Sequence, residues 1–332
     1  MGAARNLQGM CGQLMMKSGH QTTLLDDVAI SGVGVHSGLA STLTLRPADA
    51  DTGIVVLRAA SASQPEREIR ADVRAVTATE FATVLGDAKG PLCSTAEHVL
   101  AALRGLGVDN AVVELDGPEV PIMDGSAAAF VAAIDQAGIT TQNKPRRFIE
   151  ILKPVRVCKD NALGELRPYS HGFRVEAEIE FSNKLIGRQA LSIDIEPNSF
   201  RREIANARTF GFMNDVAKLW SAGYARGASL DNTLVVADSR VLNPAGLRYP
   251  DEFVRHKVLD AVGDLALAGL PLLGVYRTFR GGHKLNHAVL TALMADRSAW
   301  RIVEPQTAAR RSRGHADVAT GLVAPAYGPE IS

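Results

Sequence analysis

Three polar side chains recur every four residues in one segment of the chain, at His256, Asp260 and Asp264. On an α-helix this spacing places all three side chains along one face. Phe253 and Leu267 lie beside that face, and valine and leucine residues form a second apolar stripe nearly opposite. We therefore expect a helix that is buried on most sides, and buried charge requires a partner or a metal ion.

A metal hydrolase site is the chemistry that a histidine and an aspartate one helical turn apart can serve. A catalytic zinc site uses three protein ligands, an open position for water and a carboxylate that takes the water proton. His256 and Asp260 supply two ligands, and His98 is the best candidate for the third, with Glu97 beside it as the base. Neighbours on a helix point about 100° apart, so one can bind the metal ion while the other faces the water.

Each of these residues also has an ordinary structural interpretation. Ser94 and Glu97 fit a capping box, in which the glutamate bonds the Ser94 amide. His98 alone fits a partly buried histidine, and His256 with Asp260 fits a simple pair of side chains one turn apart. Only as a set do these residues indicate metal chemistry.

His283 follows two glycines at a predicted strand-to-helix junction, where the backbone can approach a ligand closely. A histidine there can act as a general acid, and Asp264 can orient it and favour its charged form. A surface loop histidine is the alternative. Residues 32–38, GVGVHSG, lack the G-x-G-x-x-G spacing of a dinucleotide site and indicate a turn between strands.

The composition is that of a folded protein with well-filled cores. The chain has 332 residues, of which 46% are hydrophobic, and its 36 basic and 36 acidic residues give zero formal net charge. This length allows two domains, and the charge argues against a nucleic-acid partner bound by a large positive surface. Three widely spaced cysteines indicate no disulfide framework, so we expect a reducing cytoplasm. No apolar run reaches the roughly 18 residues of a membrane span.

Strand and helix patterns follow the same order in the two halves of the chain. In the first half, strands are predicted at 41–46, 53–58 and 109–115, and helices at 94–104 and 126–136. In the second half, strands are predicted at 148–157, 173–181, 190–195 and 273–279, and helices at 250–269 and 284–294. The shared order predicts two α+β domains of one architecture, joined near residues 141–145.

Residues 200–238 interrupt this order and are interpreted as an insertion in the second domain. They begin with an amphipathic stretch at 201–207 and include a glycine-rich stretch at 223–227. Such a segment can line a ligand passage, and a covering helix with a loop is the alternative. The predicted division is an extension at 1–19, a first domain at 20–142, a second domain at 143–305 and a solvated tail at 306–332.

Several segments together resemble the zinc-dependent UDP-3-O-acyl-N-acetylglucosamine deacetylases that commit bacteria to lipid A synthesis. The matching motifs, in order over about residues 20–300, are GVGVHSG (32–38), AEHVLAAL (96–103), EVPIMDGS (119–126), ARTFGF (207–212), SLDN (229–232), DEFVRHKVLDAVGD (251–264) and GGH (281–283). The resemblance implies an α+β fold of two similar domains, each a sheet with a helix pair. The helices of both domains would face each other between the two sheets, with the site at their junction.

The resemblance also implies roles for the matching positions in the hydrolysis of the substrate acetamide to a free amine and acetate. The implied ligands of one catalytic zinc ion are His98, His256 and Asp260. The implied proton-transfer residues are Glu97 as general base and His283 as general acid, oriented by Asp264. The implied substrate contacts are Thr209 at the amide oxygen, Lys257, and Phe210 beside an acyl-chain passage formed by the insertion.

Two other functions stand as alternatives at this stage. One is a zinc amidohydrolase that acts on another acylated sugar, and the other is a non-catalytic nucleotide-sugar binding protein of the same fold. Histidine and carboxylate ligands also suit iron(II) or cobalt. We expect a cytoplasmic monomer whose partner is its small-molecule substrate, with neither nucleic acid nor a transmembrane segment.

Overall fold

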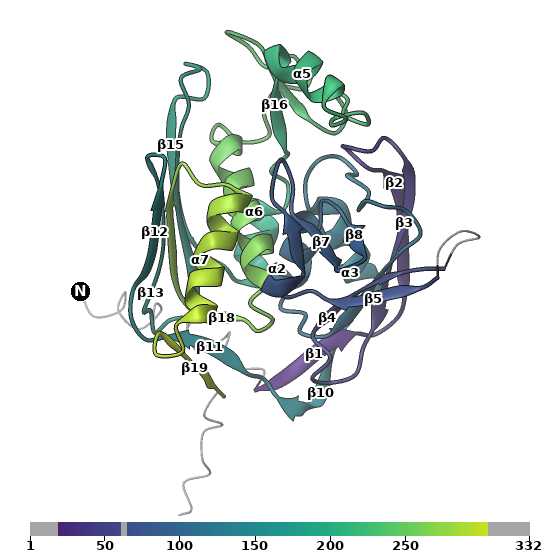
Figure 1. Cartoon of the computed structure of the whole chain (residues 1–332), viewed down its shortest axis with the longest axis vertical. Coiled ribbons are helices and arrows are strands. Elements are labelled where there is room, and N and C mark those ends of the chain that lie inside the picture. Colours follow the sequence, from purple (N-terminus) through teal and green to yellow (C-terminus); the bar gives the residue numbers. More distant parts are fainter. Residues whose placement is uncertain (1–18, 61–64, 305–332) are drawn as a thin grey trace, which may run out of the picture.

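Two β-sheets form the outer layers of the protein, and its main helices pack between them (Figure 1). The structure is a computed structural model, and it describes residues 19–60 and 65–304. The extension expected at 1–19, apart from its last residue, and the tail expected at 306–332 lie outside the described residues. The observed layers confirm the predicted α+β architecture, with helices facing each other between two sheets.

The first sheet has the strand order β2-β3-β9-β4-β5, in which only β4 and β9 pair in parallel. Its strands are β2 (Val28–Val33), β3 (Ala40–Pro47), β4 (Ile54–Arg58), β5 (Arg67–Arg70) and β9 (Ala111–Leu115). In β3, Ser41, Leu43 and Leu45 are buried and alternate with more exposed residues, as a half-buried strand requires. The three strands predicted in this half are therefore confirmed as β3, β4 and β9.

A smaller sheet and a short helix lie beside this first sheet. The small sheet has the order β6-β7-β8, with β6 at Val76–Ala78, β7 at Val84–Asp87 and β8 at Gly90–Cys93. The 3-10 helix η1 (Val73–Ala75) precedes it. This sheet leads directly into the helix that carries Glu97 and His98, so it sets where that helix begins.

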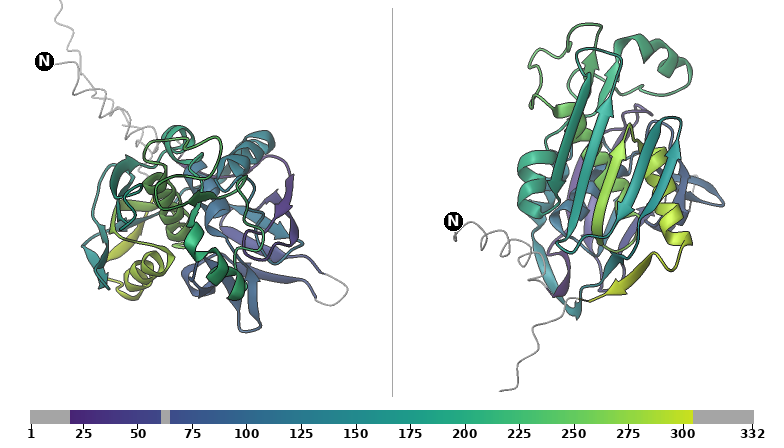
Figure 2. Two further views of the ribbon diagram at one scale, coloured as in Figure 1. Left: turned by 90° about the horizontal axis from the view of Figure 1, so that it is seen from above. Right: turned by 90° about the vertical axis from the view of Figure 1, so that its left-hand side faces the viewer.

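The second sheet has seven strands and is seen face-on in the right-hand view of Figure 2. Its strands are β11 (Phe148–Ile151), β12 (Val155–Lys159), β13 (Ala162–Arg167), β14 (Phe173–Glu180), β15 (Arg188–Asp194), β18 (Leu272–Phe279) and β19 (Trp300–Val303). The single strand predicted at 148–157 was wrong, because Pro154 has no N–H to donate and separates β11 from β12. The predictions near 173–181, 190–195 and 273–279 are confirmed.

Four helices fill the space between the sheets. They are α2 (Glu97–Leu106), α3 (Ala128–Ala137), α6 (Glu252–Ala266) and α7 (His283–Ala295). Helix α2 ends at Gly107, which adopts φ +81° as a left-handed cap. Helix α6 is buried along nearly its whole length, as the two apolar stripes predicted.

Helices α2 and α6 approach each other very closely at Gly263. A Cβ atom at that position would lie 2.0 Å from the carbonyl oxygen of Glu97, which no side chain tolerates without backbone movement. Glycine therefore lets the helix of the first half and the helix of the second half meet. The same contact places Glu97 next to the polar face of α6.

The insertion projects beyond one end of the layers, at the top of Figure 1. It contains β16 (Phe210–Phe212) in parallel with β17 (Leu234–Val236), the 3-10 helix η3 (Met213–Asp215) and helix α5 (Val216–Ser221). The amphipathic stretch with which the insertion begins, at 201–207, contains most of a turn of π-helix, η2 (Phe200–Ile204), and the short helix α4 (Pro197–Ser199) comes directly before it. The insertion is thus a small strand-helix-strand unit.

Residues 141–145, where we expected the domains to join, form part of β10 (Ile139–Pro145). This strand pairs with β1 (His20–Leu24), so the connection is a hydrogen-bonded ribbon. Among the described residues, no helix has the length and apolar character needed to span a bilayer.

Candidate metal centre

Three buried side chains converge where α2 meets α6. Potential ligand atoms of His98, His256 and Asp260 all lie within 4.8 Å of one another. His256 Nε2 lies 3.3 Å from Asp260 Oδ1, and His98 Nε2 lies 3.8 Å from the same oxygen. Within residues 19–60 and 65–304, this is the only such cluster of histidine, cysteine or carboxylate groups.

The polar atoms of this cluster present free lone pairs to a cation. His256 Nδ1 donates to the carbonyl oxygen of Ala207 at 3.0 Å, which leaves Nε2 as a lone-pair donor facing Asp260. Asp260 Oδ1 is buried and has no hydrogen-bond partner among the described residues. Such an orphaned carboxylate oxygen between two imidazoles is costly without a cation, so the residues fit a metal ion.

Burial keeps both imidazoles neutral and therefore able to coordinate. It lowers the pKa of His98 to about 3, with His256 acting in the same direction, and it also lowers the pKa of His256. For Asp260, burial opposes ionisation, but the facing His256 and Lys257 hold the pKa of the carboxyl below its usual range. The three groups thus offer two neutral nitrogens and one carboxylate, a donor set that suits zinc.

Glu97 faces this cluster and does not cap its own helix. Its Oε2 accepts a hydrogen bond from the Thr83 amide at 3.0 Å, while the Ser94 amide donates to Pro118. Helix α2 begins at Glu97 itself, with Ala96 at the N-cap, so the capping-box interpretation was wrong. Burial raises the pKa of Glu97 to about 7, although His283 opposes the shift.

His283 is the first residue of α7 and lies on the other side of Glu97. Its Nδ1 donates to Asp264 Oδ2 at 2.9 Å, and its Nε2 lies 3.9 Å from Glu97 Oε1. Burial favours the neutral imidazole, but Asp264 and Glu97 outweigh it and raise the pKa of His283 to about 10. The interpretation as a surface loop histidine was therefore wrong, because the side chain is only 10% exposed.

Two residues that the sequence analysis missed hold Asp264 in place. Thr83 Oγ1 donates to Asp264 Oδ1 at 2.6 Å, and Asn286 Nδ2 donates to Asp264 Oδ2 at 2.8 Å. Tyr276 in turn donates to Asn286 Oδ1 at 2.7 Å. Asn286 follows His283 by three residues and so shares its helix face, which was a usable signal. Thr83 is 181 residues from Asp264, and no local pattern connects them.

The segment that enters the insertion is fixed beside the candidate metal ligands by a buried ion pair. Arg208 Nε lies 2.9 Å from Glu252 Oε1, and both side chains are buried. Ala207, whose carbonyl orients His256, and Thr209 are the neighbours of this arginine in the chain. Thr209 is half-buried and its amide donates to Gly125 at 2.7 Å. The ion pair therefore fixes the chain segment that carries both Thr209 and the Ala207 carbonyl, which orients His256.

Phe210 and Lys257 extend the site towards the insertion. The ring of Phe210 lies edge-on to Phe253 at 5.0 Å and within 6.4 Å of the His256 ring, centroid to centroid. Lys257 Nζ lies 5.4 Å from the Phe210 centroid and donates to Asp260 Oδ2 at 2.8 Å. An aromatic surface thus begins directly beside the metal cluster, with an ammonium group at its edge.

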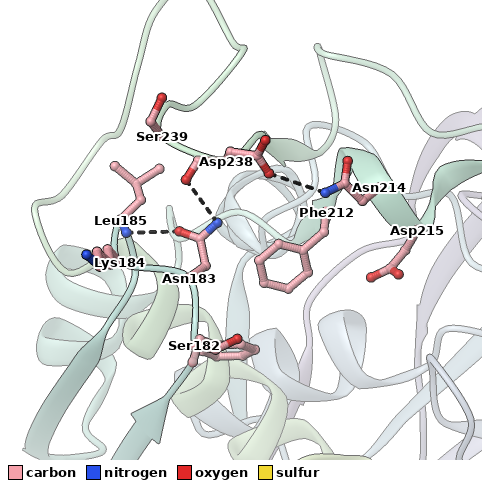
Figure 3. A pocket seen from close by; sticks show the side chains of 10 residues that line it. Ser182, Asn183, Lys184, Leu185, Phe212, Asn214, Asp215, Asp238 and Ser239 are labelled. Carbon is pink, nitrogen blue, oxygen red and sulfur yellow. Dashed lines mark hydrogen bonds between the residues drawn. The ribbon is translucent and has the colours of Figure 1, made fainter.

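This aromatic surface continues to an open pocket between the tip of the β14–β15 hairpin and the insertion (Figure 3). The pocket has a volume of about 850 Å³, and Phe181 and Phe212 lie on its wall. Both rings also contact Phe210. Asn183 ties the two walls together by donating to the carbonyls of Ala237 and Asp238. A line of aromatic contacts therefore connects the metal cluster to this pocket.

A second pocket of about 480 Å³ opens on the other side of His283. Three cationic side chains line it, from Lys159, Arg280 and Lys284. Arg280 also pairs with Glu180 at 2.9 Å. His283 therefore lies between a metal cluster on one side and a cationic pocket on the other.

Comparison with known proteins gives one consistent result. The family model described as UDP-3-O-acyl N-acetylglycosamine deacetylase matches residues 21–295. Relatives from Brucella ovis, Brucella canis and Brucella melitensis are each 51% identical over 286 residues, which is 86% of this chain and 99% of theirs. Each of these relatives is named UDP-3-O-acyl-N-acetylglucosamine deacetylase.

Proposed function

The chain belongs to the UDP-3-O-acyl-N-acetylglucosamine deacetylase family, and from that premise we propose that its metal cluster is the centre of a zinc-dependent deacetylase. Its function is the hydrolysis of the acetamide of UDP-3-O-acyl-N-acetylglucosamine, which yields acetate and a free amine in lipid A biosynthesis. The alternatives of a different acylated sugar or of a non-catalytic binding protein are not favoured by the comparisons. The observation that carries the mechanism is the unpartnered Asp260 Oδ1 between two neutral imidazoles.

His98, His256 and Asp260 would hold the zinc ion. When bound there, zinc supplies Lewis acidity, which activates a water molecule and polarises the acyl oxygen. The Ala207 carbonyl orients His256 for this task, because it occupies the other ring nitrogen. Thr209 is our candidate for the residue that donates to the amide oxygen as negative charge develops on it.

Glu97 is the proposed general base. Its carboxylate is held through one oxygen by the Thr83 amide, and burial brings its pKa to about 7. A carboxylate with a pKa near the working pH takes a proton from water more readily than an exposed glutamate does. The proton leaves the water as its oxygen attacks the acetamide carbon.

His283 is the proposed general acid. The charge of Asp264 keeps its imidazole protonated at neutral pH, so a proton is available for the amine as the C–N bond breaks. Glu97 and His283 thus work in opposite protonation states, with 3.9 Å between His283 Nε2 and Glu97 Oε1. The two residues divide the proton transfers between water and the leaving amine.

The two pockets suggest how the substrate lies across the site. We assign the acyl chain to the route along Phe210 into the pocket beside the insertion, because that route is lined by aromatic rings. We assign the diphosphate to the pocket beside His283, because Lys159 and Lys284 supply positive charge there. Lys257 would contact the sugar between them.

We also propose that the two halves are separate domains at 20–142 and 143–305, with the insertion at 200–238. Each half has its own sheet and helices, which supports this division. The candidate metal ligands come from both halves. A cytoplasmic monomer remains our proposal for the working form of the protein. The substrate is a small nucleotide sugar, so no protein or nucleic-acid partner is required for the reaction.

Acetate release from UDP-3-O-acyl-N-acetylglucosamine, measured together with zinc content, tests the mechanism. We expect about one zinc ion per chain. Glu97→Ala and Glu97→Gln should each lose about 10²–10⁴-fold in rate and keep the metal, because a base is lost but no ligand. Glu80→Gln, at an exposed position, is the control and should act like the wild type. A Glu97 variant as fast as the wild type would show that another group takes the proton.

A further inference from the structure

Arg104, in the last turn of α2, is a cation that lacks a partner. Its Nε and Nη1 atoms are buried, although the side chain as a whole keeps partial exposure. Among the described residues, no group forms a hydrogen bond or ion pair with it. Asp109 acts on Arg104 only through space, because its two oxygens accept from Thr22 and Arg146. The charge of Arg104 is therefore not neutralised locally.

The neighbouring Arg146 has a guanidinium group with hydrogen-bond and ion-pair partners. Arg146 Nε donates to Asp109 Oδ1 at 3.0 Å, and its Nη2 donates to the Gly107 carbonyl at 3.0 Å. This pair is neutral as a whole. Of the two arginines, only Arg146 forms an ion pair among the described residues.

Arg104 lines a cavity of about 60 Å³ between the two halves of the molecule. On the side of the second half, the lining is mostly apolar and includes Phe148, Phe173, Ile195 and Leu272. Arg146, which is paired with Asp109, also lines the cavity. Ser170 and His171 are exposed and lie at its rim. The cavity holds several water-sized spheres, since one such sphere needs roughly 10–15 Å³. It is separate from the metal cluster, because Glu97 and Arg104 are about 10 Å apart along the axis of α2.

An unpaired cation against apolar walls is energetically unfavourable. Burial lowers the pKa of Arg104 to about 10, so the group is still charged at neutral pH. A bound anion would remove this penalty and fill the cavity. The planar edge of a guanidinium matches a carboxylate, which accepts two parallel hydrogen bonds.

We propose that this cavity is a binding site for a small monocarboxylate, with the carboxylate on Arg104 and a short alkyl group against Phe148, Phe173 and Ile195. One free positive charge favours a monoanion, because a phosphate dianion would leave excess negative charge near Asp109. The volume favours an acid of two to four carbons. Because its walls come from both halves, the bound acid would stabilise their docking at the end of α2 that is remote from the chemistry.

Sodium propionate is the probe, compared with sodium chloride at equal ionic strength, on the zinc-loaded full chain. We expect propionate to raise the Tm of the wild type by on the order of 5 °C at a hundredfold excess over Kd. Equilibrium dialysis with labelled propionate should lose one bound molecule per chain in Arg104→Met. The matched control is Arg74→Met, which removes an arginine whose side chain is 85% exposed and should bind like the wild type.

Arg104→Lys keeps the charge but not the planar edge, and we expect it to bind propionate at least tenfold more weakly. This variant also serves if Arg104→Met fails to fold, which deacetylase activity would reveal. Equal propionate binding by wild type and both Arg104 variants would overturn the proposal, since the acid would then occupy another site. A Tm increase with phosphate but not with propionate would overturn it as well.

Discussion

At the residue scale, Asp264 sets the protonation state of the site. Its carboxylate accepts from Thr83, His283 and Asn286 at once, and it is almost completely buried. Asp264 raises the pKa of His283 through its charge and through the hydrogen bond that it accepts from the ring. The raised pKa of His283 is therefore a property of the whole network.

Asp264→Asn should move the alkaline limb of the pH–rate profile to lower pH. In the proposed mechanism His283 is the general acid only while it is protonated, so kcat/KM should fall as pH rises through the pKa of His283. Removing the negative charge of Asp264 lowers that pKa from about 10, and the fall begins earlier. The profile of kcat/KM against pH measures this directly, with exposed Asp231→Asn as the control. An unmoved alkaline limb in Asp264→Asn would contradict the assignment.

At the element scale, the site depends on how closely α2 and α6 approach. Gly263 allows the contact, and the buried pair of Arg208 and Glu252 fixes the segment that crosses the start of α6. Gly263, Arg208 and Glu252 take no part in the proposed reaction. They determine whether the candidate site residues of α2 and α6 lie close together.

Gly263→Ala should destabilise the protein and reduce its activity together. The added methyl group would lie 2.0 Å from the Glu97 carbonyl oxygen, so the helices must separate. Overpacking of this kind costs about 1–3 kcal/mol. Urea unfolding gives the change in stability, and Gly211→Ala is the control, because nothing lies within 4 Å of a Cβ there. Wild-type stability in Gly263→Ala would mean that the helices have room to spare.

Glu252→Ala should cost more than the loss of an exposed ion pair. It leaves Arg208 buried without its carboxylate partner, a change worth about 3–5 kcal/mol. Glu150→Ala is the comparison, since Glu150 pairs with Arg301 at the surface and its loss costs about 0–1 kcal/mol. Denaturant midpoints of the two variants should differ clearly. Similar midpoints would show that the buried pair adds little.

At the scale of the whole molecule, the metal cluster joins the two halves of the chain. His98 comes from α2, whereas His256 and Asp260 come from α6. An ion bound to all three would tie the two layers of helices together. Metal binding at this cluster would then be coupled to the docking of the two halves.

Chelation should therefore lower the Tm of the whole protein. Metal at a thousandfold excess over Kd stabilises the folded state by about 4 kcal/mol, and EDTA removes that contribution. His98→Ala lacks one ligand and should show a much smaller change on chelation. Differential scanning calorimetry with and without EDTA compares the two proteins. An equal shift in both would place the stabilising metal elsewhere.

Much of the secondary structure and several candidate site residues could be predicted from the local sequence. The period of four on α6 and the residue pattern of β3 depend on neighbours a few residues apart, and they predicted helix and strand correctly. The Glu97–His98 dipeptide and His283 were identified as candidates for the same reason. Side-chain type and local spacing are sufficient for such statements.

Other features came only from the tertiary structure. The sequence allowed Glu97 to cap its own helix, and only the fold brought the Thr83 amide to its carboxylate. Likewise, Thr83 and Asp264 are 181 residues apart, and the unpartnered charge of Arg104 depends on what its neighbours already bind. Hydrogen-bond partners and burial are set by packing between distant segments. Local sequence therefore named the groups that can do the chemistry, and long-range packing decided which of them share a site.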